Sequence, residues 1–246
     1  MWTKTQLVSA LQAESKPLLE KEITAFSASA HTAFAEEQHA LLVQRAEKYF
    51  SEDIPALPFS VFELYWKTGD RQTFQTPYYE RRGRLLVFSL LTWMHPDNTV
   101  YRDALAEILW AICAEPFWCL PAHFMDTQEN PLPFELFATE LDLFACETGF
   151  ALAETLELTR ALLPEMIVQQ VETQLEHRIF APFSDGERVF RFESMTNNWS
   201  GVCAGAIGGA ALHCLKDSTR LAAILHRCLC STEVYLNSFG NDGVCT

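Results

Sequence analysis

The sequence predicts an all-α protein built from antiparallel helix hairpins. Apolar residues recur at helical spacing along almost all of the 246 residues, whereas alternating strand patterns are nearly absent. The long helical segments also come in pairs, each with a short inner connection and a longer connection to the next pair. Because 49% of the residues are hydrophobic and only 20% are charged, the chain can bury a large core, and we expect a single domain over residues 1–246.

The first part of the chain predicts two helices followed by an irregular stretch. Residues 5–26 and 31–50 are rich in Ala, Leu, Glu and Gln, which favour helix formation. Residues 51–77 are rich in aromatic side chains and are expected to be irregular. Four residues that interrupt helices lie within them: Pro55, Pro58, Gly69 and Pro77.

Three helix hairpins follow. The predicted pairs are 79–94 with 99–114, 135–162 with 164–180, and 198–216 with 218–239. We expect Thr99 to cap the second helix of the first pair, and Pro164 to lie in the first turn of its helix. The pairs begin about 55 to 65 residues apart. A series of stacked helix hairpins indicates either an open α-solenoid or a curved α/α toroid. The alternation over residues 188–192 allows one short strand but no sheet.

Charge and cysteine usage restrict the class of partner. The 18 Lys and Arg residues against 32 Asp and Glu residues give a net charge of −14, which disfavours nucleic acid and anionic membrane surfaces as partners. The first residues lack the basic head and apolar run of a signal peptide, and no apolar run reaches the length of a membrane span. The eight cysteines lie mostly in apolar helical patterns, so we expect buried thiols and a cytoplasmic protein.

Metal or cofactor binding is not expected. The sequence holds no C-x-x-C motif, and Cys228 and Cys230 are two residues apart on a predicted helix, where side chains point in different directions. The predicted helix 198–216 contains four glycines but no phosphate-binding loop. We expect these glycines to mark close approach of another helix or of a ligand: Gly201, Gly205, Gly208 and Gly209.

The segment Asn197-Asn198-Trp199 stands at the start of a predicted helix and allows two interpretations. Asn is among the best residues for capping a helix, so one Asn can cap the helix while Trp199 packs beside it. Alternatively, a side-chain amide faces a cleft and donates a hydrogen bond to a carboxylate, and Trp199 stacks on a sugar.

A second candidate segment contains Trp118 and His123 in a loop between hairpins. A single histidine in a loop is more often a surface residue or a satisfied hydrogen-bonding group than a catalyst. However, the surrounding apolar residues Trp118, Pro121 and Phe124 can form a rim in which the imidazole pairs with a carboxylate.

Carboxylates form the last candidate set. A hydrolase needs two acidic side chains that face each other, and the sequence alone does not pair them. The simpler interpretation of each is a solvated surface residue. The candidates are Glu140, Asp142, Glu147, Asp185 and Glu193.

Several of these segments together resemble the heparinase II/III-like family of polysaccharide lyases. The resemblance rests on four stretches, in order and at the expected spacing, and covers about residues 75–246. They are Trp118-Cys119-Leu120-Pro121-Ala122-His123, Leu141-Asp142-Leu143-Phe144-Ala145-Cys146-Glu147, Thr196-Asn197-Asn198-Trp199-Ser200-Gly201-Val202-Cys203 and Tyr235-Leu236-Asn237-Ser238-Phe239-Gly240-Asn241-Asp242-Gly243-Val244.

The resemblance implies that the chain is an incomplete α/α toroid built from antiparallel helix hairpins, and that it is the toroid part of a longer protein. It also implies β-elimination at a uronate. A catalytic tyrosine and a β-rich part are then expected beyond Thr246, and a toroid that ends there predicts exposed apolar surface and self-association. Asn198, or its neighbour Asn197, would bind the uronate carboxylate, and His123 would bind substrate or assist proton transfer. Trp118 and Trp199 would stack on sugar rings.

The net charge favours a short, weakly charged acidic oligosaccharide over a highly sulfated one. Two other classes remain open: a helical module that binds a glycan or a protein without catalysis, and a glycoside hydrolase or epimerase on the same scaffold.

Overall fold

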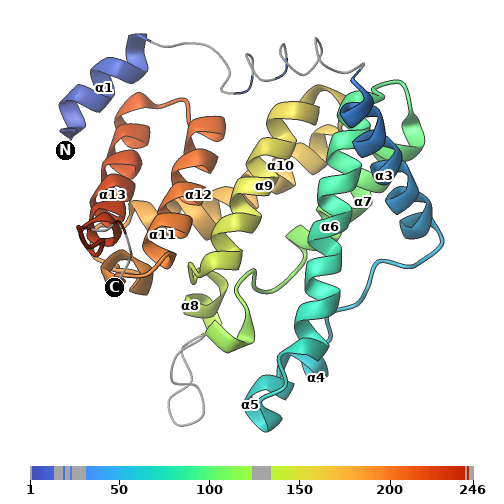
Figure 1. Ribbon diagram of the computed structural model, residues 1–246, viewed down its shortest axis with the longest axis horizontal. Coiled ribbons are helices and arrows are strands. Elements are labelled where there is room, and N and C mark those ends of the chain that lie inside the picture. The colour runs from blue at the N-terminus through green and yellow to red at the C-terminus, as the bar shows by residue number, and fades with distance from the viewer. Residues whose placement is uncertain are drawn as a thin grey trace. The chain divides into compact units, whose positions relative to one another are not determined.

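The protein is all-helical in the computed structural model, which describes residues 2–13, 19, 23, 32–123, 134–241 and 243 (Figure 1). Within these ranges no β-strand is present, so the predicted all-α class is confirmed. Most of the predicted helix 5–26 beyond Ala13 lies outside the described residues, as does Phe124 of the predicted apolar rim.

The chain divides into two compact units, whereas the sequence predicts a single domain. Unit 1 comprises residues 1–15, 116–154 and 172–246, and unit 2 comprises residues 16–115 and 155–171. Neither unit is contiguous in sequence, because the chain passes between them four times, and two of these crossings lie within a helix. Each unit is therefore described separately.

Unit 2 is organised around the hairpin of α6 and α7, which lie side by side (Figure 1). The described residues of its first segment form the helices α3 (Ala33–Phe50), α4 (Phe59–Phe62), α5 (Leu64–Thr68), α6 (Gln72–Met94) and α7 (Thr99–Cys113). α7 is capped by Asn98, whose side chain accepts from the backbone N–H groups of Val100 and Tyr101. The cap is thus one residue earlier than the predicted Thr99, which is the first residue inside the helix.

Helix α6 begins at Gln72, seven residues before the predicted start, and contains Pro77 in its interior. Proline removes one helical hydrogen bond and crowds the preceding turn. The turn is held by buried aromatic packing, because Phe74 contacts Phe62 on one side and Tyr78 on the other. Burial of two large rings offsets the lost hydrogen bond, so the expectation of an irregular stretch through residue 77 is wrong here.

Unit 1 is built on a second hairpin, formed by α12 (Trp199–Cys214) and α13 (Ser218–Leu236), with α1 (Lys4–Ala13) packed on α13 (Figure 1). Its remaining elements include the 3₁₀ turns η1 (Pro121–His123) and η4 (Arg191–Ser194), and the short helices α8 (Phe134–Ala138) and α11 (Ala181–Ser184). The π-helical turn η3 (Glu176–Phe180) leads directly into α11. Residues 188–192, which the sequence allows as a strand, run through an extended stretch into η4.

The predicted helix 135–162 is interrupted. It is divided into α8, α9 (Leu143–Thr159) and the 3₁₀ turn η2 (Arg160–Leu162), and it is followed by α10 (Glu165–Leu175). The break falls just before α9 because the Asp142 side chain accepts from the backbone N–H of Ala145, at 2.7 Å. An acidic side chain in this position starts a new helix and does not continue the previous one.

The glycines of α12 differ in what surrounds them, which gives a paired prediction. A Cβ on Gly209 would lie 2.6 Å from the Phe150 ring, whereas a Cβ on Gly205 would meet nothing within 4 Å. The expected close approach therefore holds at Gly209 and not at Gly205. Gly209→Ala should lower the free energy of unfolding by about 1–3 kcal/mol, because the ring must shift. Gly205→Ala should raise it by up to about 1 kcal/mol through helix propensity. Urea unfolding measures both, and equal effects would contradict the packing.

Candidate functional site

The candidate site lies in unit 1, where His123 ends the 3₁₀ turn η1. The turn is closed by a hydrogen bond from the His123 backbone N–H to the Leu120 carbonyl, at 3.0 Å. The imidazole Nδ1 lies 2.7 Å from Oδ2 of Asp142, and the His123 side chain is 11% exposed. The ring is therefore held by a carboxylate while a small part of it reaches the surface.

Asp142 is the residue that fixes the imidazole. Its side chain is 2% exposed, and its oxygens accept from the backbone N–H groups of Leu120 and Ala145. Because an ionised carboxylate can only accept hydrogen bonds, Asp142 favours the tautomer of His123 in which Nδ1 carries the hydrogen between them. In a neutral imidazole this arrangement leaves the lone pair on Nε2, which is the nitrogen that can accept a proton.

Two aromatic rings surround the imidazole. The centroid of the Trp199 ring lies 4.8 Å from that of the His123 imidazole. The Phe144 ring stacks on the imidazole with a centroid distance of 5.5 Å. Trp199 opens α12 and Phe144 lies in the first turn of α9. Thus three segments that are distant in sequence meet at one imidazole.

The two asparagines before Trp199 have different roles. The Asn197 side chain accepts a hydrogen bond from the Trp199 backbone N–H at 3.1 Å, so its amide oxygen is used in starting α12. Asn198 occupies the N-cap position, but its side chain makes no capping hydrogen bond. The Asn198 amide is exposed next to Trp199, and it has no hydrogen bond within the described part of the chain.

The start of α12 is held in place by its neighbours. The Ser200 hydroxyl contacts the carbonyl groups of Phe192 and Met195, and the Ser238 hydroxyl at the end of α13 donates to the Thr196 carbonyl at 2.8 Å. The backbone that carries Asn198 is therefore fixed on both sides.

Trp118 is buried and does not reach the surface beside His123. Its side chain is 1% exposed, and the Arg178 guanidinium lies over its ring, 4.8 Å from the centroid. Arg178 also donates to the Pro116 carbonyl, at 3.3 Å. In this structure Trp118 packs the loop that carries His123 and presents no ring face to a ligand.

Further acidic groups surround Asp142. Burial raises the pKa of Glu140, whose ion pair with Arg188 at 2.9 Å acts in the opposite direction. Desolvation also raises the pKa of Glu147, and the negative charge of Asp142 adds to this increase. The site thus combines an oriented imidazole with carboxyl groups that resist ionisation.

The raised pKa of Glu147 gives a pH-dependent prediction. The folded state disfavours the charged form of Glu147. The ionised side chain therefore lowers the stability of the fold near neutral pH, and this loss disappears below the ordinary pKa of 4.5. Glu147→Gln should therefore stabilise the protein at pH 7 by no more than about 0.5 kcal/mol, because the side chain is exposed and screened. Urea unfolding at pH 7 and pH 4 should show this gain only at pH 7. A loss of stability at pH 7 would contradict the expected repulsion.

The remaining sequence candidates are used within the fold. Glu193 makes an ion pair with Arg227 at 2.7 Å, and Asp185 accepts from the Glu187 backbone N–H at 3.0 Å. In the part of the chain that the structure describes, no group of three or more His, Cys, Asp and Glu side chains is arranged to hold a metal ion.

Sequence reasoning identified His123, Asn198 and Trp199 but did not pair His123 with Asp142. An Asp directly before an apolar helical run was a sequence signal for a helix cap at Asp142, but no sequence signal pointed to its contact with His123. No protein-family model matches the chain, and no curated protein matches its sequence. None of the described helices has both the length and the apolar character of a membrane span.

Proposed function

We propose that the chain is the helical part of a heparinase II/III-like polysaccharide lyase, and that it binds a uronate of an acidic oligosaccharide in unit 1. One observation carries the proposal. The exposed Asn198 amide, which the helix cap does not use, adjoins Trp199, whose ring contacts the Asp142-oriented His123. Asn198, Trp199 and His123 all lie in the stretches that carry the sequence resemblance.

The chemistry of β-elimination explains why these residue types suit the site. A base removes the proton at C5 of the uronate, and the negative carboxylate beside that carbon makes the proton poorly acidic. A neutral amide such as Asn198 can donate a hydrogen bond to the carboxylate and stabilise the charge that develops. The imidazole of His123, whose Nδ1 lies beside Asp142, would bind the substrate or assist proton transfer.

The arrangement also bears on the size of the substrate. Trp199 is half-buried and can contact one sugar ring, whereas Trp118 is buried. With the Glu147 carboxylate near the site, a highly sulfated chain would be repelled. A short uronate oligomer of low charge density is therefore the proposed ligand.

The toroid, the compartment and the assembly belong to the same proposal. The hairpins α6–α7 and α12–α13 support a toroid made of helix pairs. The described cysteines all carry thiols, in keeping with a reducing cytoplasm. Exposed rings such as those of Phe34 and Phe59 support self-association, which light scattering can measure.

A panel of uronate oligosaccharides tests the function. Wild type and His123→Ala are incubated with each oligomer, and the ultraviolet absorbance of the unsaturated uronate product is followed together with binding. The proposal expects binding that His123→Ala weakens, with elimination where the chain holds a sufficient base. Binding without any unsaturated product would instead favour the non-catalytic glycan-binding module. Hydrolysis products without unsaturation would favour the hydrolase, and the absence of binding to every oligomer would overturn the proposal.

A further inference from the structure

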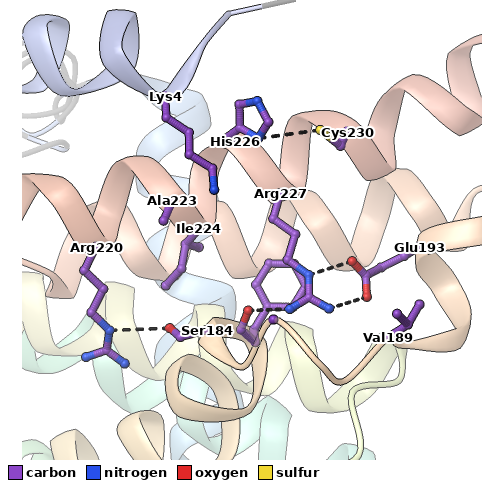
Figure 2. A pocket seen from close by; sticks show the side chains of 12 residues that line it. Lys4, Ser184, Val189, Glu193, Arg220, Ala223, Ile224, His226, Arg227 and Cys230 are labelled. Carbon is purple, nitrogen blue, oxygen red and sulfur yellow. Dashed lines mark hydrogen bonds and ion pairs between the residues drawn. The ribbon is translucent and has the colours of Figure 1, made fainter.

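An opening in unit 1 shares no residue with the His123 site. It lies between α1, α11 and α13 and has a cavity volume of about 500 Å³. Small-ligand sites span roughly 300–1,000 Å³, so the opening can hold a molecule of a few hundred daltons. Its lining includes Lys4, Arg220, His226, Arg227 and Cys230 (Figure 2).

A thiol and an imidazole lie together at this opening. Cys230 and His226 are four residues apart on α13, which places them on the same helix face. The Cys230 Sγ lies 3.7 Å from the His226 Nδ1, within hydrogen-bond range for sulfur (Figure 2). The imidazole is therefore positioned to accept the proton of the thiol, and the thiolate is the reactive form of cysteine.

Cys230 differs from the other described cysteines in its exposure. Cys230 is exposed and Cys214 is half-buried, whereas the remaining five are buried: Cys113, Cys119, Cys146, Cys203 and Cys228. Burial raises the pKa of the Cys119 and Cys146 thiols, and it raises that of Cys228 to about 12. Buried thiols of this kind stay protonated and out of reach of a reagent.

The positive charge around the opening favours an anionic reagent, although the whole chain has a net charge of −14. Three positively charged residues line the opening, Lys4, Arg220 and Arg227, and one negatively charged residue, Glu193. Arg227 is engaged by Glu193, and Arg220 by Glu176, which lies outside the lining. Lys4 makes no ion pair with the described residues, and its side chain extends from α1 toward α13 (Figure 2). Its ammonium is thus available to a carboxylate.

We propose that Cys230 is a site of thiol–disulfide exchange with a small disulfide that carries carboxylates, of the glutathione type. His226 accepts the thiol proton, and the Cys230 thiolate attacks one sulfur of the disulfide. The old S–S bond breaks as the new one forms, and the leaving thiolate takes up the proton. The protein thiol is oxidised to a mixed disulfide, and one half of the reagent is reduced to a thiol.

Oxidised glutathione is the probe for the first test. The reduced protein is used in a Cys245→Ser background, because Cys245 lies outside the described residues. Intact mass spectrometry over time, followed by peptide mapping, should show a first adduct at Cys230 that forms about tenfold faster than one at Cys214. Cys230→Ser should remove this fast phase, and Cys214→Ser should retain it. Equal rates at the two cysteines would overturn the proposal.

The second test separates the pocket from simple exposure. Lys4→Gln should slow the reaction with oxidised glutathione roughly threefold, and it should leave the reaction with neutral hydroxyethyl disulfide unchanged. Lys216→Gln removes a positive charge outside the lining and is the matched control. His226→Gln should slow both reagents. A Lys4→Gln variant that reacts at the wild-type rate with both reagents would show that the charge of the opening plays no part, and would contradict the proposed site.

Discussion

Replacing Glu115 with Gln is expected to lower the free energy of unfolding by about 3–5 kcal/mol. The Glu115 carboxylate in unit 2 is 2% exposed, and two guanidinium groups bind it. Arg82 donates to both of its oxygens at 2.7 Å, and Arg81 donates to one at 3.1 Å. The amide of Gln would turn one acceptor into a donor facing Arg82 and would leave two buried cations without a counter-charge.

The surrounding contacts explain why the effect should be large. Arg81 also donates to the carbonyl groups of Pro55 and Ala111, so it links the connection before α4 to the end of α7. Loss of the charge at Glu115 therefore weakens several segments of unit 2 at once. Urea unfolding followed by circular dichroism measures the change.

An exposed ion pair in the same unit provides the control. Glu63 pairs with Lys67 at 2.7 Å in the i,i+4 arrangement, and the Lys67 side chain is 61% exposed. Glu63→Gln should change the free energy of unfolding by no more than about 0.5 kcal/mol. If Glu115→Gln costs no more than this control, the buried carboxylate does not stabilise unit 2 as described.

Replacing Asp142 with Asn is expected to cost about 2–4 kcal/mol and to change the tautomer of His123. Asp142 accepts from Leu120, Ala145 and His123, and an amide can offer only one oxygen to these donors. The remaining donors are buried without an acceptor, and the new NH₂ group lies against an N–H. His123 is then favoured in the tautomer with its proton on Nε2.

Nitrogen NMR of the imidazole, together with urea unfolding, tests this change. Asp217→Asn is the matched control, because Asp217 caps α13 through Thr219 and Arg220, and Asn is an equally good cap. That control should stay within about 0.5 kcal/mol of wild type. If the His123 tautomer is the same in wild type and in Asp142→Asn, Asp142 does not orient the imidazole.

The helix hairpins could be predicted because their patterns are local. The ends of α12 and α13 all lie within three residues of their predicted limits. Helical periodicity and the turn before Asp217 determine where these two helices begin and end. The break before α9 was missed because residues 135–162 stay apolar on both sides of it. Only the side-chain hydrogen bond of Asp142 to Ala145 separates the two helices.

The candidate site was predictable in its residue types but not in their arrangement. Sequence alone left open which asparagine caps α12, because both are good capping residues. The structure uses Asn197 for the hydrogen bond to Trp199, and this frees the Asn198 amide. The contact between His123 and Trp199, and the burial of Trp118, depend on tertiary packing that no local pattern records.

The central claim is that the Asn198 amide binds a uronate carboxylate, and calorimetric titration of the chain with a uronate oligomer tests it most directly. Asn198→Ala should keep the melting temperature of wild type, because this side chain has no capping bond, and should bind the oligomer at least about tenfold more weakly. Asn197→Ala should instead lose about 1 kcal/mol of stability. The carboxyl-reduced oligomer should bind wild type and Asn198→Ala alike. Undiminished affinity of Asn198→Ala for the uronate form would contradict the claim.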